Sequence, residues 1–372
     1  MRIGFISTYF YPVKGGAENN CFYLAKELSK NNEVYVFTSH KGDLKSYEIV
    51  DNIHVHRSRQ FFRFGYYLAF YPSMLFNIMK TDLDVLHVHS YGFLWHDLIV
   101  LFKKLFNKKL KLVITPHGPF MALDSYPLHA RIFKRLVKPV VKLTNSIYDK
   151  VLQVNPSQKS WLVDEGFKAD SIVYLPNGIP KNIFNKADNS KFVKEYDLKN
   201  KIIISYVGRI QEYKGLDQVI KVLPKLSKNV LFIIFGKGED KERLESLVKV
   251  LNLNDRVLFS GGSDEIKYNV LKSSHIYAFP SKWEAFGITI LEAMAFGNSI
   301  VSSKTEGGKF LIKDNINGFL FDFNNLEQLE NKLTLLINNK SLRNKISKNN
   351  IKKSKEFLWE NIAKDLLEIY QS

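Results

Sequence analysis

The residues best suited to do chemistry are two glutamates, Glu284 and Glu292, which lie eight positions apart with Gly287 between them. The run 288–296 has helical character and is followed by Gly297, so we predict a helix that begins near Gly287. Its N-terminus would present unpaired N–H groups and a positive dipole end, which favour a phosphate. Glu292 could then reach sugar hydroxyls while Glu284 projects from the loop. The pair indicates a nucleotide-sugar site, although two such glutamates are more often unrelated surface and helical residues.

Two cations follow the first predicted strand of the second half, in Gly208-Arg209 and, five residues further on, Lys214-Gly215. A guanidinium can bind a diphosphate through two parallel hydrogen bonds, and an ammonium acts as a compact point charge. Arg209 and Lys214 are therefore candidates to hold a diphosphate. Taken alone, they are equally consistent with two solvated cations in a basic protein.

Glycine-rich junctions follow other predicted strands. Gly15 and Gly16 lie between the first strand and a helix, where the absence of a Cβ lets the main chain approach a phosphate or a sugar. Gly236 ends a strand of the second half and opens the loop 236–239. Both junctions are also consistent with plain turns, and no strand is followed by the Gly-x-Gly-x-x-Gly pattern of dinucleotide-binding proteins.

One histidine is a candidate for the site. His117, in the segment Thr115-Pro116-His117-Gly118, ends a first-half strand and places an imidazole at the edge of the expected sheet. A lone histidine is usually structural, but the strand-end position and the flanking Pro and Gly make a functional role equally plausible. His89 ends the preceding strand and is the poorer candidate.

The composition bounds the class of protein. The chain has 372 residues, enough for two domains with well-buried cores, and its 45% hydrophobic and 24% charged residues are typical of a globular protein. No apolar run approaches the roughly 18–20 residues of a membrane-spanning helix, and the N-terminal residues suit a buried strand rather than a secretory signal. The single cysteine, Cys21, excludes an internal disulfide and a cysteine-based zinc cluster. We expect a cytoplasmic protein.

The chain is strongly basic, with a formal net charge of +17 from 54 Lys and Arg against 37 Asp and Glu. Such an excess favours polyanions: nucleic acid, anionic lipid headgroups or phosphorylated substrates. Residues 129–143 contain five cations and no acid, with Lys134, Lys138 and Lys142 at helical spacing, and Pro139 is expected to kink or interrupt this helix. With the aromatic-rich segment 61–76, this region suits peripheral docking on an anionic membrane. A core helix with snorkelling lysines and an ordinary aromatic core is an equal alternative.

Short strands rich in Val and Ile alternate with amphipathic segments, which predicts an α/β protein with parallel sheets. The polar segment 176–200 separates two series, so we expect two doubly wound, Rossmann-like domains whose strand ends face a central cleft. The domains are expected at residues 1–178 and 179–353, with residues 354–372 as a final helix. The predicted strands are 2–7, 33–39, 53–57, 85–90, 111–115, 150–154 and 172–175, followed by 201–207, 230–236, 256–260, 275–279, 299–302 and 318–321.

Taken together, the motifs resemble those of the retaining, metal-independent glycosyltransferases of the two-Rossmann-domain GT-B fold. The specific likeness is to the "group 1", family 4-like enzymes. It spans nearly the whole chain, because the Gly-Gly loop, Pro-His-Gly, Pro-Asn-Gly, Gly-Arg…Lys-Gly and Glu-x7-Glu occur in that family's order. In relatives the last helix crosses back to the first domain, and Trp359 and Tyr370 match that ending.

The resemblance implies how the donor diphosphate is held. Gly16, preceded by Gly15, would approach the donor β-phosphate, and Arg209 with Lys214 would hold the diphosphate. The first domain would bind the acceptor and the second the donor. Further main-chain contacts to the donor are expected from Gly236, Phe286, Gly287 and Ile288.

The resemblance also implies how the sugar and the ribose are bound. Glu292 would bind the ribose hydroxyls, Glu284 the transferred sugar, and His117 the sugar near its reacting centre. Residues 307–311 depart from the family's usual Gly-Gly-x-Pro-Glu, and the loop 236–239 departs from its usual Gly-Asp/Glu-Gly-Pro. No sugar preference is therefore carried over.

The implied reaction moves a hexose-type sugar from a nucleotide diphosphate donor to a glycan or a polyprenyl-linked acceptor, as in cell-surface polysaccharide or glycoconjugate synthesis. Neither a cofactor nor a metal is expected, and nucleic acid is not an expected partner. The donor nucleotide (UDP, GDP or ADP) and the oligomeric state stay open. The alternatives are an epimerase or a phosphorylase of the same fold, and a basic nucleic-acid-binding protein without catalysis.

Overall fold

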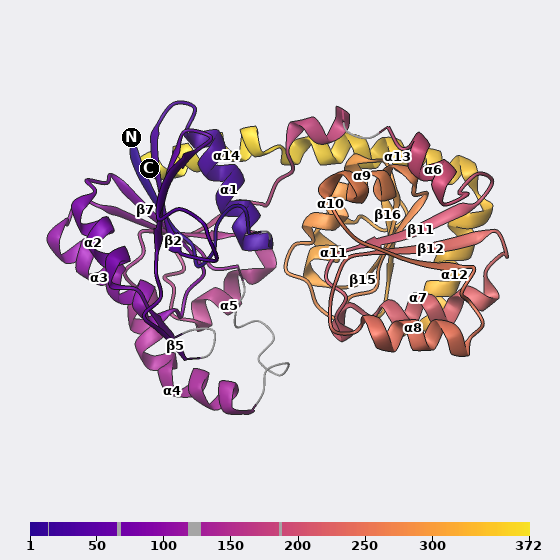
Figure 1. The fold of residues 1–372 in the computed structure, drawn as a ribbon, viewed down its shortest axis with the longest axis horizontal. Helices are drawn as coiled ribbons and strands as arrows, with labels where there is room; N and C mark the ends of the chain where they lie inside the picture. Colours follow the sequence, from indigo (N-terminus) through magenta and orange to yellow (C-terminus); the bar gives the residue numbers. More distant parts are fainter. Residues whose placement is uncertain (14, 65–67, 118–127, 186–187) are drawn as a thin grey trace. The chain divides into compact units, whose positions relative to one another are not determined.

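The computed structural model describes residues 1–13, 15–64, 68–117, 128–185 and 188–372. The chain divides into two compact units (Figure 1). The N-terminal unit comprises Met1–Asn177 together with Trp359–Ser372, and the C-terminal unit comprises Gly178–Leu358. Each unit is built around its own predominantly parallel sheet, as predicted.

The N-terminal unit contains an eight-stranded sheet in the order β10-β9-β8-β7-β1-β2-β4-β3. The chain builds outward from β1 on one side and then returns to place β7 on the other, so the strand order reverses between β1 and β7. Ligands of doubly wound sheets bind beyond the strand ends at such a reversal. The strands are β1 (Arg2–Ile6), β2 (Glu33–Ser39), β3 (Tyr47–Val50), β4 (Ile53–Ser58), β7 (Val85–His89), β8 (Lys111–Thr115), β9 (Lys150–Gln153) and β10 (Ile172–Tyr174).

The seven strands predicted in this half are confirmed, but three further strands were not predicted. β3 is antiparallel to β4 and has alternating exposure, because it is an edge strand with one solvated face. Asp51 and Asn52 join the two strands with positive φ values of 50° and 63°, as a tight hairpin requires. The strands β5 (Phe62–Phe64) and β6 (Leu68–Phe70) form a separate small hairpin.

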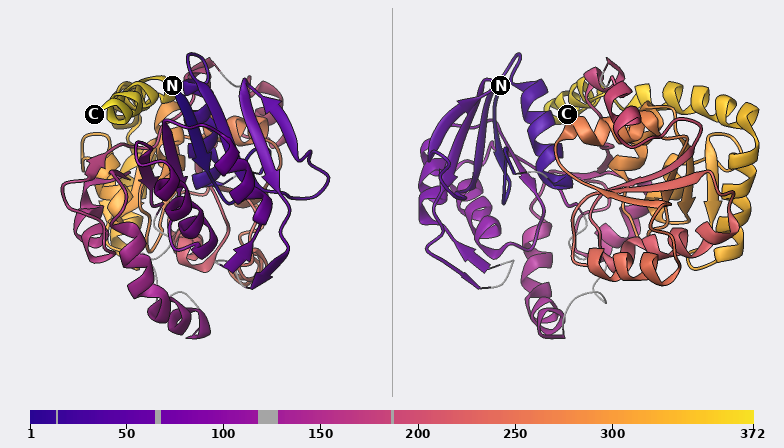
Figure 2. Two further views of the ribbon diagram at one scale, coloured as in Figure 1. Left: turned by 90° about the vertical axis from the view of Figure 1, so that its left-hand side faces the viewer. Right: turned by 45° about the vertical axis from the view of Figure 1, so that its right-hand side comes forward.

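Helices cover both faces of the N-terminal sheet (Figures 1 and 2), which explains why its strands are apolar on both sides. Ile3 and Phe5 point into one core, which they share with α1 and α14, whereas Ile6 points into the other. The helices are α1 (Gly16–Leu28), α2 (Pro72–Lys80), α3 (Leu94–Phe106), α4 (Leu128–Asn145), α5 (Lys159–Asp164) and α14 (Trp359–Gln371), with the short 3-10 helix η2 (Pro156–Gln158).

Two expectations about helices need correction. Pro139 does not interrupt α4, which runs through it as one helix, whereas the expected kink stays a prediction. Pro139 is exposed, so water can satisfy the carbonyl that it leaves unbonded. The tail is not one helix from residue 354, because α13 (Lys340–Ser354) ends at Ser354 and α14 begins at Trp359, where the indole stacks on Tyr23 at 5.7 Å between ring centroids. The boundary between the two units lies at Asn177 and Gly178, within the predicted segment 176–200, and the rest of that segment contains η3 (Lys181–Asn185) and α6 (Ser190–Glu195) of the C-terminal unit.

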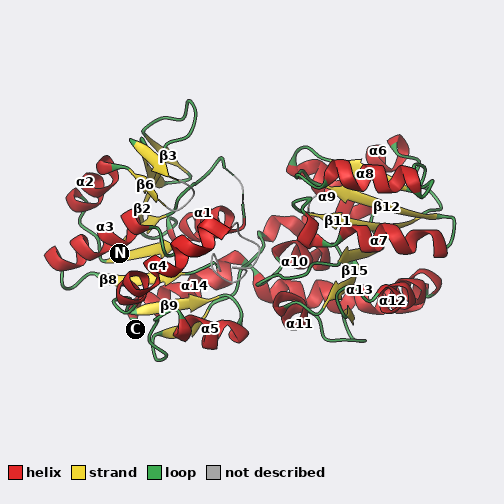
Figure 3. Ribbon diagram, turned by 90° about the horizontal axis from the view of Figure 1, so that it is seen from below, coloured by secondary structure: helices red, strands yellow, loops and turns green. Residues whose placement is uncertain are grey.

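The C-terminal unit contains a six-stranded parallel sheet in the order β13-β12-β11-β14-β15-β16, with helices on both faces (Figure 3). All six predicted strands are confirmed: β11 (Ile202–Val207), β12 (Val230–Phe235), β13 (Val257–Ser260), β14 (Ile276–Phe279), β15 (Ser299–Ser303) and β16 (Gly318–Phe321). The strand order reverses between β11 and β14, which places the expected ligand position beyond these two strands. The helices are η3 (Lys181–Asn185), α6 (Ser190–Glu195), η4 (Glu212–Lys214), α7 (Leu216–Val222), η5 (Leu223–Lys225), α8 (Lys241–Val250), α9 (Asp264–Ser273), α10 (Ile288–Ala295), α11 (Glu306–Leu311), α12 (Leu326–Asn338), α13 (Lys340–Ser354) and η6 (Lys355–Phe357).

Candidate active site

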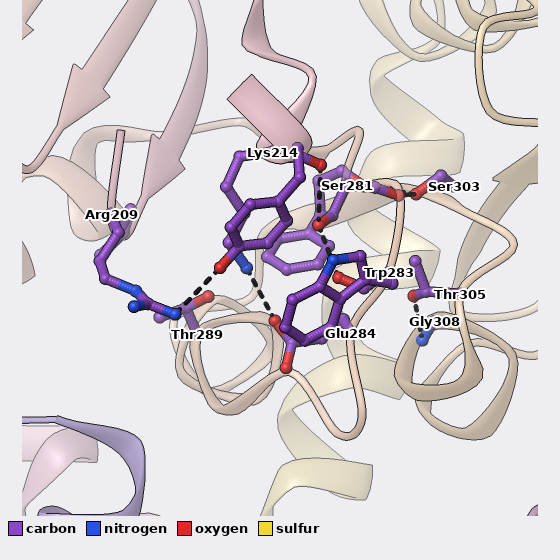
Figure 4. Close-up of polar contacts among 12 residues, drawn as sticks. Arg209, Lys214, Ser281, Trp283, Glu284, Thr289, Ser303, Thr305 and Gly308 are labelled. Atoms are coloured by element: carbon purple, nitrogen blue, oxygen red, sulfur yellow. Dashed lines mark hydrogen bonds and ion pairs between the residues drawn. The ribbon is translucent and has the colours of Figure 1, made fainter. Parts of the chain in front are cut away.

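The predicted cations and the first glutamate meet at the strand reversal of the C-terminal unit (Figure 4). Arg209 leaves the end of β11, Lys214 ends the short helix η4, and Glu284 lies in the loop after β14. β11 and β14 are paired neighbours, so segments about 70 residues apart in sequence emerge at the same edge. The topology therefore brings these residues together.

Lys214 is buried beside Glu284. Its Nζ lies 2.9 Å from Glu284 Oε2, and the side chains are 9% and 24% exposed, respectively. The ammonium also lies over the rings of Tyr213 and Phe279, 4.8 Å and 5.1 Å from their centroids. Tyr213 stacks in turn on Trp283 at 4.7 Å. Aromatic faces and a carboxylate are favourable neighbours for a partly desolvated ammonium, so the Lys214 side chain is fixed in place.

Arg209 is exposed and has no acidic partner among the described residues. Its guanidinium donates one hydrogen bond, to the Tyr213 hydroxyl at 2.9 Å. The same tyrosine therefore orients Arg209 through its hydroxyl and Lys214 through its ring. A guanidinium carries five N–H donors and only one is used in this hydrogen bond, so the others can bind an incoming anion.

The N-terminus of α10 completes this edge. Gly287 adopts a left-handed conformation (φ 88°) and precedes the helix without a side-chain cap. Its carbonyl accepts from Ile290 N at 2.9 Å, and no hydrogen bond within the described chain occupies the amides of Gly287, Ile288 and Thr289. The Phe286 ring is buried against other aromatic rings, so only its main chain can face a ligand. The predicted set of amides is thus presented at a positive helix end.

α11 supports the loop that carries Glu284. Thr305 caps this helix by accepting from Gly308 N at 3.0 Å, and Gly307 N donates to the Glu284 carbonyl at 2.9 Å. A Cβ on Gly307 would lie 2.3 Å from the Phe286 carbonyl oxygen, so only glycine permits this approach. The departure from the family pattern at 307–311 therefore keeps both glycines in supporting positions.

Glu292 lies in α10 with Lys267 of α9 as its partner. The Lys267 Nζ is 2.7 Å from Glu292 Oε1, and the side chains are 15% and 10% exposed. Burial by itself lowers the pKa of Lys267, but Glu292, with smaller contributions from Tyr268 and Asp264, raises it, so the pKa is raised overall. Burial raises the pKa of the Tyr277 phenol, and both Glu292 and Glu284 raise it further, which places both carboxylates near this tyrosine. The sequence did not identify Lys267, because a lysine on an amphipathic helix is indistinguishable from a solvated one.

Gly236 has a packing role at this edge. The position of a Cβ on Gly236 would be 1.8 Å from the Gly208 carbonyl oxygen, and Ile210 N donates to the Lys237 carbonyl at 2.9 Å. The missing side chain thus lets the loops after β11 and β12 contact each other directly. Donor contact by Gly236 stays a prediction.

In the N-terminal unit, the predicted glycines lie at the strand reversal. Gly16 begins α1, and Gly15 precedes it in extended conformation without a side-chain cap. A Cβ on Gly16 would meet no atom within 4 Å, so the space beside it is open. This arrangement leaves room for a group such as a phosphate at the start of α1. The neighbouring Lys14 lies outside the described residues.

His117 belongs to a buried chain of histidines. Its Nε2 lies 2.8 Å from His89 Nδ1, and the His87 ring stacks on His89 at 4.6 Å. His87 also contacts Thr115 Oγ1 at 2.8 Å and Tyr370 Oη at 2.6 Å. Burial lowers the pKa of His117 to about 4 and that of His87 to about 3, so both imidazoles are neutral at pH 7.

His89 is therefore closer to the site than the sequence suggested. A strand places residues i and i+2 on one face, so the pair His87 and His89 was a usable signal for a shared cluster. His117 adopts a positive φ of 50°, which is uncommon for a residue other than glycine and occurs often at functional sites. The following residue of the motif, Gly118, lies outside the described chain.

The arrangement suits binding of a diphosphate-linked sugar. The C-terminal unit offers two cations and a helix N-terminus for phosphate oxygens, and two carboxylates for hydroxyl groups. No group of three or more His, Cys, Asp or Glu side chains is placed to hold a metal ion within the described ranges. These features define the class as an α/β protein whose C-terminal sheet carries a candidate anion-binding edge.

Comparison with known proteins identifies the family. The family "Glycosyl transferases group 1" matches residues 188–353, and "Glycosyltransferase Family 4" matches residues 14–182. An uncharacterized glycosyltransferase of Methanocaldococcus jannaschii is 30% identical over 98% of this chain and 96% of its own. The gpi3 subunit of phosphatidylinositol N-acetylglucosaminyltransferase of Schizosaccharomyces pombe is 26% identical over 81% of this chain and 66% of that protein. The crystal structure of Anabaena HepE in complex with UDP and glucose has a TM-score of 0.80 at 20% identity, covering 99% of this chain and 98% of that one.

The chain therefore has the GT-B fold and belongs to the group 1, family 4-like glycosyltransferases. It is an enzyme, and the non-catalytic nucleic-acid-binding alternative is set aside. The described residues include no helix with the length and apolar composition needed to cross a bilayer.

Proposed function

We propose that this enzyme transfers a hexose-type sugar from a nucleotide diphosphate donor, with retention at the anomeric carbon and without a metal ion. The observation that carries the proposal is the fixed pair of Lys214 and Glu284 beside the open guanidinium of Arg209 and the N-terminus of α10. The structural neighbour HepE was crystallised with UDP and glucose, which supports a donor of this kind. The donor nucleotide is left as UDP, GDP or ADP.

In the proposed reaction the bond between the anomeric carbon and the phosphate oxygen breaks, and the acceptor oxygen bonds to the same face of that carbon. The acceptor proton passes to an oxygen of the departing diphosphate, so no protein nucleophile is needed. Negative charge grows on the diphosphate, and Arg209, Lys214 and the α10 amides stabilise it. Each preorganised donor of this kind typically contributes about 3–4 kcal/mol.

The remaining roles follow from position. Glu284 would bind hydroxyls of the transferred sugar and Glu292 those of the ribose, since both carboxylates are fixed by lysines. In the N-terminal unit, which would bind the acceptor, Gly16 would approach the donor β-phosphate. The neutral His117 would contact the sugar near its reacting centre. A glycan or lipid-linked acceptor is proposed, because one relative is named as a phosphatidylinositol N-acetylglucosaminyltransferase subunit.

The test is a thermal-shift screen of UDP, GDP and ADP followed by turnover with the matching sugar nucleotides. A ligand that binds only the folded state raises the unfolding temperature, so one nucleotide should stand out. Nucleoside diphosphate release should require an acceptor and persist in EDTA, and NMR of the product should show the anomeric configuration of the donor. Absence of any nucleotide shift, loss of activity in EDTA, or an inverted product would each contradict the corresponding part of the proposal.

A further inference from the structure

Helix α4 of the N-terminal unit carries an uncovered apolar stripe. Five aliphatic side chains along it are between 50% and 73% exposed: Leu128, Ile132, Leu136, Val140 and Leu143. At 3.6 residues per turn they fall within an arc of about 120° along the whole helix. Single exposed aliphatic residues are ordinary on protein surfaces, whereas a continuous row marks an interaction surface.

The stripe is not the face that packs on the protein. Val141 and Thr144 are buried, and at helical spacing they are turned by about 130° from the centre of the stripe. α4 packs against α3 of the same unit. The helix therefore packs on the protein through a different face, and the stripe takes no part in the core packing.

A row of cations borders one side of the stripe. Arg131, Arg135, Lys138 and Lys142 fall within an arc of about 60°, and α4 contains no acidic residue. Lys138 is paired with Glu165 at 2.8 Å, but no acidic residue of α4 itself offsets the row. The exposed part of the helix thus presents an apolar strip with a positive margin.

We propose that α4 docks in the interface of an anionic lipid bilayer, with the stripe toward the acyl chains and the cations at the level of the phosphates. Interfacial helices have this division of faces and enter by about 5–10 Å. Cations near a negatively charged leaflet add attraction that weakens with salt. The net charge of +17 favours the same surface.

A second copy of the chain is a poorer occupant of this face. A two-fold contact brings the same patch of both subunits together, so both cationic rows would be brought into one interface. Like charges placed opposite one another oppose such an interface. The lipid surface instead supplies negative charge along the whole row.

This inference concerns where the enzyme works and stands independently of the donor chemistry.

The aromatic segment of the same unit contributes less than the sequence suggested. Tyr71 is buried and its neighbour Phe70 is partly buried, whereas Phe61, Phe62 and Phe76 are exposed. Tyr66 and Tyr67 lie outside the described residues. The docking surface is therefore defined on α4 alone.

The experiment is co-flotation of the full chain with vesicles of phosphatidylcholine alone or mixed with phosphatidylglycerol. The apolar variant is Ile132→Ser with Leu136→Ser, and the charge variant is Arg135→Glu with Lys142→Glu. Val250→Ser is the matched control, since Val250 is a 77% exposed aliphatic residue at the end of α8 in the other unit. Circular dichroism melting checks that every variant is folded.

Wild type and the control should float with the mixed vesicles and release at high salt. Both α4 variants should lose at least tenfold in the bound fraction while remaining folded. No flotation of wild type with the anionic vesicles, or unchanged flotation of the folded apolar variant, would overturn the proposal. A concentration-dependent dimer that the apolar variant abolishes, without vesicle binding, would assign the stripe to a second copy instead.

Discussion

Removing the ammonium of Lys214 tests the proposed chemistry most directly. Lys214→Ala deletes a buried charge that lies 2.9 Å from Glu284 and over two aromatic rings. If the ammonium stabilises the departing diphosphate, its loss should cost about 3–4 kcal/mol in the transition state, which lowers kcat by about 10²–10³-fold. Binding of the nucleoside diphosphate should weaken as well, because the same charge acts on the product.

The substitution also has a cost in stability, which must be kept apart from the rate. Breaking a fully buried ion pair typically costs about 3–5 kcal/mol, because one charge is left without a partner. Glu284 is 24% exposed, so water can partly solvate its carboxylate, and we expect a smaller cost of about 1–2 kcal/mol. The variant should therefore remain folded at 25 °C.

The assay is steady-state turnover with the donor identified by thermal shift, accompanied by urea unfolding. Lys221→Ala is the matched control, because Lys221 pairs with Asp217 at 2.6 Å on the surface of α7 and lies outside the proposed site. It should change stability by about 0.5 kcal/mol or less and leave turnover unchanged. A folded Lys214→Ala enzyme with near-normal kcat would refute the assignment.

Three further predictions concern the other parts of the site. Gly16→Ala should leave the fold intact or stabilise it by up to about 1 kcal/mol, since nothing lies within 4 Å of the added Cβ and alanine favours a helix. Turnover should fall if a phosphate occupies that space. An unchanged KM and kcat would contradict this prediction. Acidification should destabilise the protein, because the unfolded chain protonates His87 below its ordinary pKa of about 6.5 while burial holds the folded pKa at about 3. The stability that this histidine contributes is present above about pH 6.5 and decreases as the pH falls, by about 2 kcal/mol at pH 5. Urea unfolding at about pH 6.5 and pH 5 should show that the unfolding free energy depends less on pH in His87→Gln than in wild type. An identical pH dependence in the two proteins would rule the account out. Lys267→Met should leave Glu292 buried without its partner, costing about 3 kcal/mol in unfolding free energy and weakening donor binding, whereas a donor KM equal to that of wild type would show that Glu292 does not need this orientation.

The sequence by itself determined the sheets and most of the chemistry-bearing residues. All thirteen predicted strands are present, since short Val- and Ile-rich segments covered by helices on both sides have a local signature. Arg209, Lys214 and Glu284 were identifiable because each follows a predicted strand at its end. The edge strand β3 was missed, because its alternating pattern is short and its Asp51-Asn52 turn was overlooked.

Only the tertiary structure decided which residues act on one another. Strand order is set by pairing between distant segments, so the adjacency of β11 and β14 that joins Lys214 to Glu284 cannot be obtained from local periodicity. The same holds for Lys267 beside Glu292 and for His89 beside His117, where each partner comes from another element. Exposure is likewise a tertiary property. The apolar helical pattern of α4 is equally consistent with a core face and with an exposed one, and only the packing shows that the stripe is uncovered. Local sequence fixes which groups are available, and the packing of the sheets fixes their distances, charges and access to solvent.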